Sequence, residues 1–279
     1  MYNTQSQTYM KRVIIAAMAA LLFTACGPKH KVLVLYYSQT GHTQTVAQQI
    51  QQALGADMEE IVCVNPYDGT YQETIARAGE ERAAGILPEI EPLKADLSKY
   101  DIIFFGYPIW YGTAAPPMLK LLEQADFSNK KLVPFCTFGS GGLQSSIDDI
   151  VRRTPESITV LPGYGVRAAR MDAVPAEVDY FLKSNGYLKG EFTPLANFSD
   201  KRPVTEDEAG LFFAAVGDYP MIQAQPVMVA TRPFDNGMEY QFTAENLPRE
   251  GMPQFGPSEM TVYVLVEAGR APVFTQVVR

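Results

Sequence analysis

From residue 31 onward the chain alternates short apolar runs of strand length with amphipathic stretches of helical period. The first run, residues 32–37, is almost wholly apolar, which suits a strand that is buried on both faces of a sheet. After it, apolar residues recur at the three- and four-residue spacing of a helix. Repeated strand–helix units of this kind build a parallel sheet with helices on both faces. The sequence therefore predicts an α/β fold.

The alternation continues to residue 190 and predicts five strands and five helices. The first helix follows residues 38–43, and Thr43 could cap its first turn. The predicted strands are residues 31–37, 58–64, 100–108, 131–139 and 157–166. The other predicted helices are residues 70–85, 116–125, 143–154 and 175–186. We expect residues 31–190 to form one domain.

Residues 191–204 break the alternation and are predicted to be a linker. After them, Thr205 and Glu208 have the spacing of a capping box at the start of a helix, and residues 235–237 are typical of a hairpin turn. Strand-like runs occupy residues 225–234, 238–245, 260–268 and 272–279. Residues 205–279 are thus predicted to be a small α+β domain. It weakly resembles cystatin-like folds but lacks their Gln-Val-Val-Ala-Gly hairpin, so protease inhibition is not supported.

The N-terminal stretch is typical of a bacterial export signal. Lys11 and Arg12 precede a short apolar run that ends in small residues before Cys26. This run resembles the lipobox of bacterial lipoproteins, which implies a signal peptide over residues 1–26 and a lipidated Cys26. A cleaved secretory signal is the alternative, and translation could start at Met1 or Met10. Lipidation would hold the protein at a membrane surface, which we expect to face the periplasm.

A cluster of small and polar residues, 38–43, separates the first strand from its helix. Backbone N–H groups at a helix N-terminus point outward, and the helix dipole favours an anion there. Gly41 permits a tight turn, and the hydroxyl groups of Ser38, Thr40 and Thr43 add neutral donors. The turn can therefore bind a phosphate monoester without lysine or arginine, although a plain polar helix start is the alternative. It matches neither the nucleoside-triphosphate loop nor the GxGxxG turn.

Two later loops leave the C-terminal ends of the third and fourth strands, the edge where open α/β sheets bind ligands. The first loop contains Trp110, the only tryptophan of the chain, next to Tyr111, and these rings could form a flat wall for a planar ligand. The second, residues 137–142, has three glycines that let the backbone approach such a ligand closely. Together with the phosphate turn, the loops predict a ligand with a phosphate at one end and a flat heterocycle at the other.

With these three motifs, residues 31–190 resemble a flavodoxin of the short-chain type. The resemblance implies the strand order 2-1-3-4-5 and non-covalently bound FMN as the cofactor. Tyr111 and Phe138 stand where similar bacterial proteins often have tryptophan and histidine. The resemblance assigns the phosphate to Ser38, Gln39, Thr40, Gly41, His42 and Thr43. It assigns one side of the ring to Pro108, Ile109, Trp110, Tyr111 and Gly112, and the other side to Thr137, Phe138, Gly139, Ser140, Gly141 and Gly142.

Three functional classes stay open at this point. The first is an FMN electron carrier that serves a redox partner protein or a small quinone-like acceptor. The second is an NAD(P)H-dependent quinone or nitro reductase, and the third is a membrane-anchored binding protein without turnover. A net charge of −8 argues against nucleic-acid binding. Two histidines and three cysteines are too few for a zinc framework, and Ser140 does not lie in the Gly-x-Ser-x-Gly turn of hydrolases.

Two groups of residues outside these loops also bear on function. Cys63 and Cys136 fall within predicted buried strands, so we expect structural, unreactive thiols without a disulfide between them. Four residues after the second strand could line the mouth of the flavin site or form a solvated helix face. These are Tyr67, Tyr71, Glu73 and Arg77.

Overall fold

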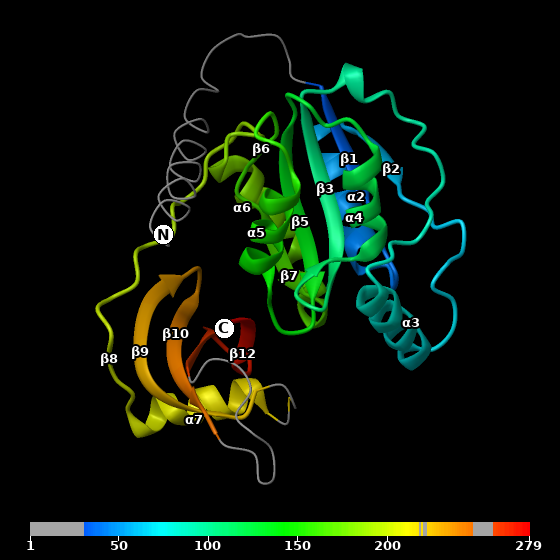
Figure 1. Cartoon of the computed structure of the whole chain (residues 1–279). Coiled ribbons are helices and arrows are strands. Elements are labelled where there is room, and N and C mark those ends of the chain that lie inside the picture. Colours follow the sequence, from blue (N-terminus) through cyan, green and yellow to red (C-terminus); the bar gives the residue numbers. More distant parts are fainter. Residues whose placement is uncertain (1–30, 218, 220–221, 248–258) are drawn as a thin grey trace, which may run out of the picture. The chain divides into compact units, whose positions relative to one another are not determined.

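The computed structural model describes residues 31–217, 219, 222–247 and 259–279 (Figure 1). The predicted signal peptide and Cys26 lie outside the described residues. The described chain forms two compact units. The first comprises the chain from residue 31 to Phe138 and Leu143–Phe192, and the second comprises Gly139–Gly142 and Thr193–Arg279.

A parallel sheet forms the centre of the first unit (Figure 1). Its strands are β2 (Asp57–Glu60), β1 (Val32–Tyr36), β3 (Ile102–Trp110), β5 (Lys131–Phe138), β6 (Thr159–Val160) and β7 (Tyr164–Arg167). They lie in the order β2-β1-β3-β5-β6, and β7 also pairs with β5. This is the predicted 2-1-3-4-5 order, with the fifth predicted strand in two pieces. All of these pairs are parallel, so the C-terminal ends of the strands share one edge.

The fifth predicted strand is interrupted at Pro162 and Gly163, between β6 and β7. Proline has no N–H to donate to a neighbouring strand. At Gly163 a Cβ atom would lie only 2.6 Å from the carbonyl oxygen of Pro134 in β5, so this position requires glycine. The backbone therefore passes close to β5 there without continuous pairing.

Five helices cover the two faces of this sheet. They are α2 (His42–Leu54), α3 (Tyr71–Ala84), α4 (Pro116–Gln124), α5 (Leu143–Arg153) and α6 (Val174–Ser184). The buried residues of α2 and α6 pack with Val34, Phe104 and Phe135, whereas α3, α4 and α5 pack against the opposite face with Leu35 and Phe105. Successive side chains of a strand point to opposite faces of the sheet. A strand that is apolar at every position therefore needs helices on both faces of the sheet to bury its side chains.

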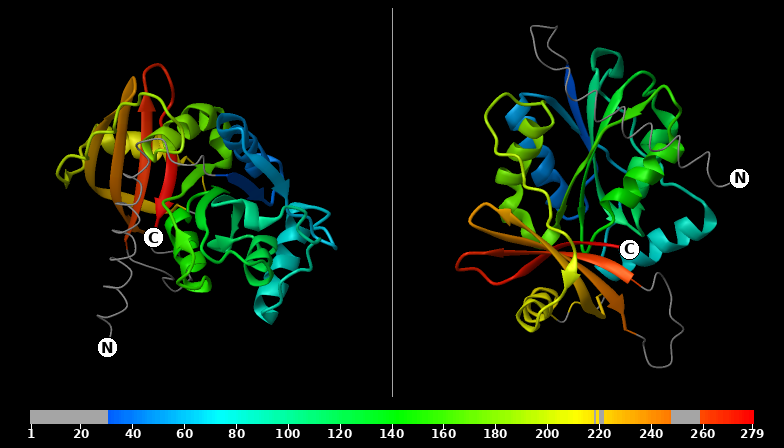
Figure 2. Two further views of the ribbon diagram at one scale, coloured as in Figure 1. Left: turned by 90° about the horizontal axis from the view of Figure 1, so that it is seen from above. Right: turned by 90° about the vertical axis from the view of Figure 1, so that its left-hand side faces the viewer.

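The second unit is an antiparallel sheet with one helix on it (Figure 2). The helix is α7 (Glu206–Val216), and the strands are β8 (Arg202–Pro203), β9 (Ala224–Phe234), β10 (Gly237–Asn246), β11 (Glu259–Glu267) and β12 (Val273–Val278). Phe212 of α7 packs with Phe242 of β10 and Val262 of β11. The predicted α+β class is therefore confirmed. Within the described residues, no helix is long and apolar enough to cross a membrane.

Much of the segment predicted as a linker, residues 191–204, belongs to this second unit. Arg202 and Pro203 form β8, which pairs with β9. The guanidinium carbon of Arg232 lies over the ring of Phe198, 4.4 Å from the ring centroid. The ring of Phe198 also meets the ring of Tyr263 in β11 edge-on. Phe192, at the start of the segment, instead belongs to the first unit and packs edge-on against Tyr180 of α6.

The start of α7 yields a pH-dependent prediction. Glu208 accepts hydrogen bonds from Thr205 and from Arg202, whose Nη1 lies 2.7 Å from Oε2. The hydrogen bond from Arg202 is the main cause that lowers the pKa of Glu208 from 4.5 to about 2. The folded state thus favours the carboxylate, and this stabilisation is full above pH 4.5 and is lost as the pH falls toward 2.

We expect Glu208→Gln to lower the free energy of unfolding by about 1–2 kcal/mol at pH 7. The difference from the wild type should shrink toward zero near pH 2. Urea denaturation of both proteins across this pH range measures it. Glu206→Gln is the control, because Glu206 is exposed in the same turn, and it should change the free energy by less than about 0.5 kcal/mol. If Glu208→Gln lowers the free energy of unfolding by the same amount at every pH, the prediction is wrong.

Candidate functional site

The turn after β1 leaves the N-terminus of α2 open to a ligand. Gly41 is the N-cap residue, with φ of 83°, a left-handed conformation that favours glycine. The N-cap side-chain hydrogen bond is absent, and the first turn has no acidic residue. A Cβ atom at Gly41 would meet no atom within 4 Å. Such a helix start offers backbone N–H donors and a positive dipole end to an anion.

Thr43 has a different role from the predicted cap. The helix starts at His42, so Thr43 lies inside its first turn and is only 2% exposed. Its hydroxyl forms a hydrogen bond of 2.8 Å with the hydroxyl of Thr137, at the end of β5. These two buried hydroxyl groups satisfy each other and join the phosphate turn to the fourth parallel strand.

The other predicted phosphate ligands differ in where their side chains point. The Ser38 hydroxyl accepts a hydrogen bond of 3.2 Å from the backbone N–H of Gln44. The exposed Thr40 shares a hydrogen bond of 3.0 Å with Nδ1 of His42. Gln39 turns away from the helix start, since its Nε2 donates to the carbonyl oxygen of Tyr67 at 2.6 Å. Thr40 and the backbone of the turn are therefore the groups best placed for an anion.

The loop after β3 is a tight hairpin that ends in β4 (Thr113–Ala114). Trp110 pairs with Thr113, and the two residues between them, Tyr111 and Gly112, have φ of 52° and 80°. This is the backbone of a type I′ turn, in which a bulky residue such as Tyr111 is strained. Contacts with α3 offset the strain, because the Tyr111 hydroxyl donates to the carbonyl oxygen of Ile75 at 2.8 Å.

Trp110 belongs to a cluster of aromatic rings at this edge of the sheet. It meets Tyr37 edge-on at 6.0 Å and Tyr67 edge-on at 5.0 Å between ring centroids. Tyr67 is 2% exposed, whereas Tyr71 is 75% exposed. Of the two tyrosines considered for the mouth of the site, only Tyr67 therefore joins the cluster. Sequence spacing could not separate them, because they are only four positions apart, with Tyr67 in the polar stretch before α3 and Tyr71 at the first position of α3.

The glycine loop is divided between the two units. Thr137 and Phe138 end β5 and are buried in the first unit. Residues 139–142 belong to the second unit, where the N–H of Val277 donates to the carbonyl oxygen of Ser140 at 2.7 Å. A Cβ atom at Gly141 would lie 2.0 Å from the carbonyl oxygen of Val277. The structure thus explains the glycine by backbone contact with Val277, and the assignment of this loop to a ring stays a prediction.

Both described cysteines are free and buried, as predicted. Burial raises the pKa of the Cys63 thiol to about 11 and that of Cys136 well above its ordinary value. Both groups are therefore protonated near neutral pH. A protonated, buried thiol is a poor nucleophile.

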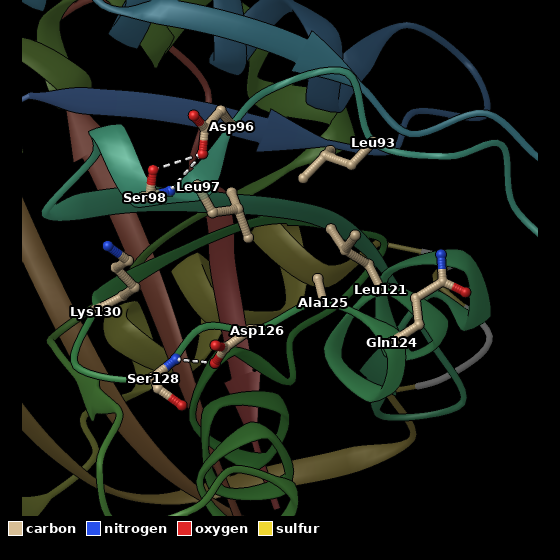
Figure 3. A pocket seen from close by; sticks show the side chains of 10 residues that line it. All are labelled: Leu93, Asp96, Leu97, Ser98, Leu121, Gln124, Ala125, Asp126, Ser128 and Lys130. Atoms are coloured by element: carbon tan, nitrogen blue, oxygen red, sulfur yellow. Dashed lines mark hydrogen bonds between the residues drawn. The ribbon is translucent and has the colours of Figure 1, made fainter.

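A cavity of about 540 Å³ lies at the opposite edge of the sheet (Figure 3). It opens between the loops that precede β3 and β5 and the end of α4, and Leu97 and Leu121 line it. Its two acids are held locally, because Asp96 accepts hydrogen bonds from Ser98 and Asp126 accepts one from Ser128 (Figure 3). It shares no residue with the predicted loops, so we do not place the functional site there.

The first unit is similar to known proteins. The family model described as Flavodoxin matches residues 31–173. A flavodoxin from Haemophilus influenzae is 30% identical over 175 residues, which cover 61% of this chain and 83% of that protein. An NAD(P)H dehydrogenase (quinone) from Azorhizobium caulinodans is 35% identical over 100 residues, 34% of this chain and 46% of that enzyme. The chain thus spans less than half of that enzyme.

Among solved structures, a flavoprotein in complex with FMN from Lactobacillus acidophilus superposes with a TM-score of 0.44 and 23% identity. The match covers 53% of this chain and 99% of that one.

Proposed function

Because the chain belongs to the flavodoxin family, whose cofactor is FMN, we propose that it is an FMN-dependent redox protein that transfers electrons at a membrane surface. When bound, FMN supplies an isoalloxazine ring that accepts and releases one or two electrons. The chain's own residues bind the phosphate, orient the ring and set the electrostatic environment.

The observation that carries the proposal is the open N-terminus of α2 at the same sheet edge as Trp110. The N-cap Gly41 leaves backbone N–H groups for the phosphate, and the Thr40 hydroxyl lies beside them. Trp110, backed by Tyr37 and Tyr67, offers an aromatic wall for the ring. A net charge of −8 makes added negative charge on the cofactor less favourable, which suits an electron donor.

The membrane part of the proposal rests on lipidation of Cys26. β1 begins at Val32, at the edge of the sheet opposite the flavin loops, and the chain from Cys26 to Val32 reaches at most about 20 Å. From Val32 to Ser38 the chain runs about 20 Å along β1, from one edge of the sheet to the other. A lipid anchor would therefore hold Val32 within about 20 Å of the bilayer, with the flavin loops at the other end of β1. A water-soluble redox protein in the periplasm could reach these loops without entering the lipid.

A quinone or nitro reductase is the second candidate, and one observation favours it. The chain is 35% identical to an NAD(P)H dehydrogenase (quinone) over 100 residues. Against it, an exported protein does not meet the cytoplasmic NAD(P)H pool. Oxidation of NAD(P)H in the presence of a soluble quinone would favour the reductase over the carrier.

The proposal is tested by titrating the full chain, solubilised in detergent, with FMN. Trp110 is the only tryptophan, so its emission reports on the aromatic wall. We expect the emission of both Trp110 and FMN to be quenched at one equivalent, because stacked rings quench each other's excited states. No change in either signal would contradict FMN binding, and a binding protein without turnover would then be the better account.

A further inference from the structure

We propose that Arg77 of α3 is a positioning residue for the ring end of the flavin site. It holds the segment Asn65–Tyr67 so that the ring of Tyr67 fixes the orientation of Trp110. This inference rests on the proposed function, because it assigns the aromatic wall to the flavin. It adds a residue outside the three ligand loops, on a helix that provides none of the predicted ligands.

Arg77 makes contacts through each nitrogen of its guanidinium. Nη1 donates to the carbonyl oxygen of Pro66 at 2.7 Å, and Nη2 donates to that of Asn65 at 3.1 Å. Nε donates to Oε1 of Glu81, one turn further along α3, at 2.8 Å. A solvated arginine on a helix face would leave most of these donors to water. The planar fork of arginine instead binds two successive carbonyl groups of one loop, which a lysine cannot match.

The same guanidinium lies over the ring of Tyr67, 4.1 Å from its centroid. The Tyr67 hydroxyl donates to Oε2 of Glu81, so the ring is held on its face and at its tip. A cation over an aromatic face is favourable, and more so when the ring is withdrawn from water. Tyr67 is 2% exposed although it lies on a loop, because Arg77 covers its ring and the apolar core of this face packs around it.

Tyr67 contacts both the aromatic wall and the phosphate turn, the first through its ring and the second through its backbone. The centroid of its ring is 5.0 Å from that of Trp110, with the ring planes at 86°. The backbone carbonyl of Tyr67 accepts the hydrogen bond of 2.6 Å from Gln39 in the phosphate turn. Movement of Tyr67 would therefore change the Trp110 wall first and the backbone of the phosphate turn only through one side chain.

The test compares Arg77→Met, which keeps the length of the side chain, with Arg77→Lys and the wild type. Dissociation constants are measured for FMN, for riboflavin, which lacks the phosphate, and for inorganic phosphate. We expect Arg77→Met to weaken FMN and riboflavin by the same factor, about tenfold, and to leave phosphate binding unchanged. Arg77→Lys keeps the positive charge over Tyr67, so its affinities for FMN and riboflavin should lie between those of Arg77→Met and the wild type.

Lys120→Met is the matched control, because Lys120 forms a partly exposed ion pair with Glu123 on α4. This variant should bind all three ligands as the wild type does. Thermal melting of each variant shows whether the fold persists, and Arg77→Lys carries the test if Arg77→Met unfolds. The inference is overturned if Arg77→Met weakens the binding of FMN but not of riboflavin, or if it changes the affinity for neither flavin.

The emission of Trp110 without any ligand separates this inference from the proposed function. If the wild type binds no flavin, the proposed function fails. Arg77→Met must still shift the emission maximum of Trp110 in the ligand-free protein, with Lys120→Met unshifted, for the positioning role to hold. An unshifted Arg77→Met spectrum would remove that role.

Discussion

Replacement of Thr40 by glutamate is expected to weaken FMN binding by at least about 100-fold, or about 2.7 kcal/mol, without unfolding the protein. Thr40 is exposed and lies one residue before the N-cap Gly41. A carboxylate there would interact favourably with the helix dipole and would repel the phosphate of FMN. Riboflavin has no phosphate, so its affinity should change less than twofold.

Thr40→Gln separates charge from size, because glutamine has the shape of glutamate without the negative charge. We expect it to weaken FMN by less than about tenfold, and high salt should recover part of the loss in Thr40→Glu because ions screen an exposed charge. Isothermal calorimetry measures the affinities of the wild type and both variants for FMN and for riboflavin. Equal losses for the two flavins in Thr40→Glu would place the phosphate elsewhere.

Gly106→Val is expected to destabilise the first unit by about 3 kcal/mol or more. Gly106 lies in β3 between Tyr36 of β1 and Phe135 of β5. A Cβ atom there would lie 2.1 Å from the ring of Phe135, and that ring is fully buried. Because the rigid ring has no free space, either it or the sheet must move. Urea denaturation followed by the emission of Trp110 reports on this unit.

A second substitution tests the cause. In the double variant Gly106→Val, Phe135→Leu, leucine removes the clashing ring atoms, so the two changes together should cost less than the sum of the two single changes. Gly210→Ala in α7 is the control glycine, because its Cβ atom meets nothing within 4 Å, and it should stabilise the second unit by about 0.5–1 kcal/mol. Additive costs at Gly106 and Phe135 would mean that the ring is not the obstacle.

The sequence predicted the fold class because its signals are periodic and local. Runs apolar throughout indicate strands buried on both faces, and the structure buries β1, β3 and β5 in this way. The spacing of Thr205 and Glu208 predicted a capping box, and both of its hydrogen bonds are present. The phosphate turn was predicted for the same reason, since a polar cluster with a glycine before a helix can be recognised within a few residues.

What only the tertiary structure decided is where loop side chains point. Gln39 looks like a phosphate ligand beside Thr40, yet its side chain binds the Tyr67 carbonyl, 28 residues away. Tyr67 and Tyr71 look alike in sequence, but only Tyr67 lies under Arg77. These side-chain orientations depend on which distant segment packs against the loop in the folded protein and provides a matching donor or ring. Local periodicity holds no information about that partner. The helices and strands therefore followed from the sequence, and the packing of Tyr37 and Tyr67 against Trp110 did not.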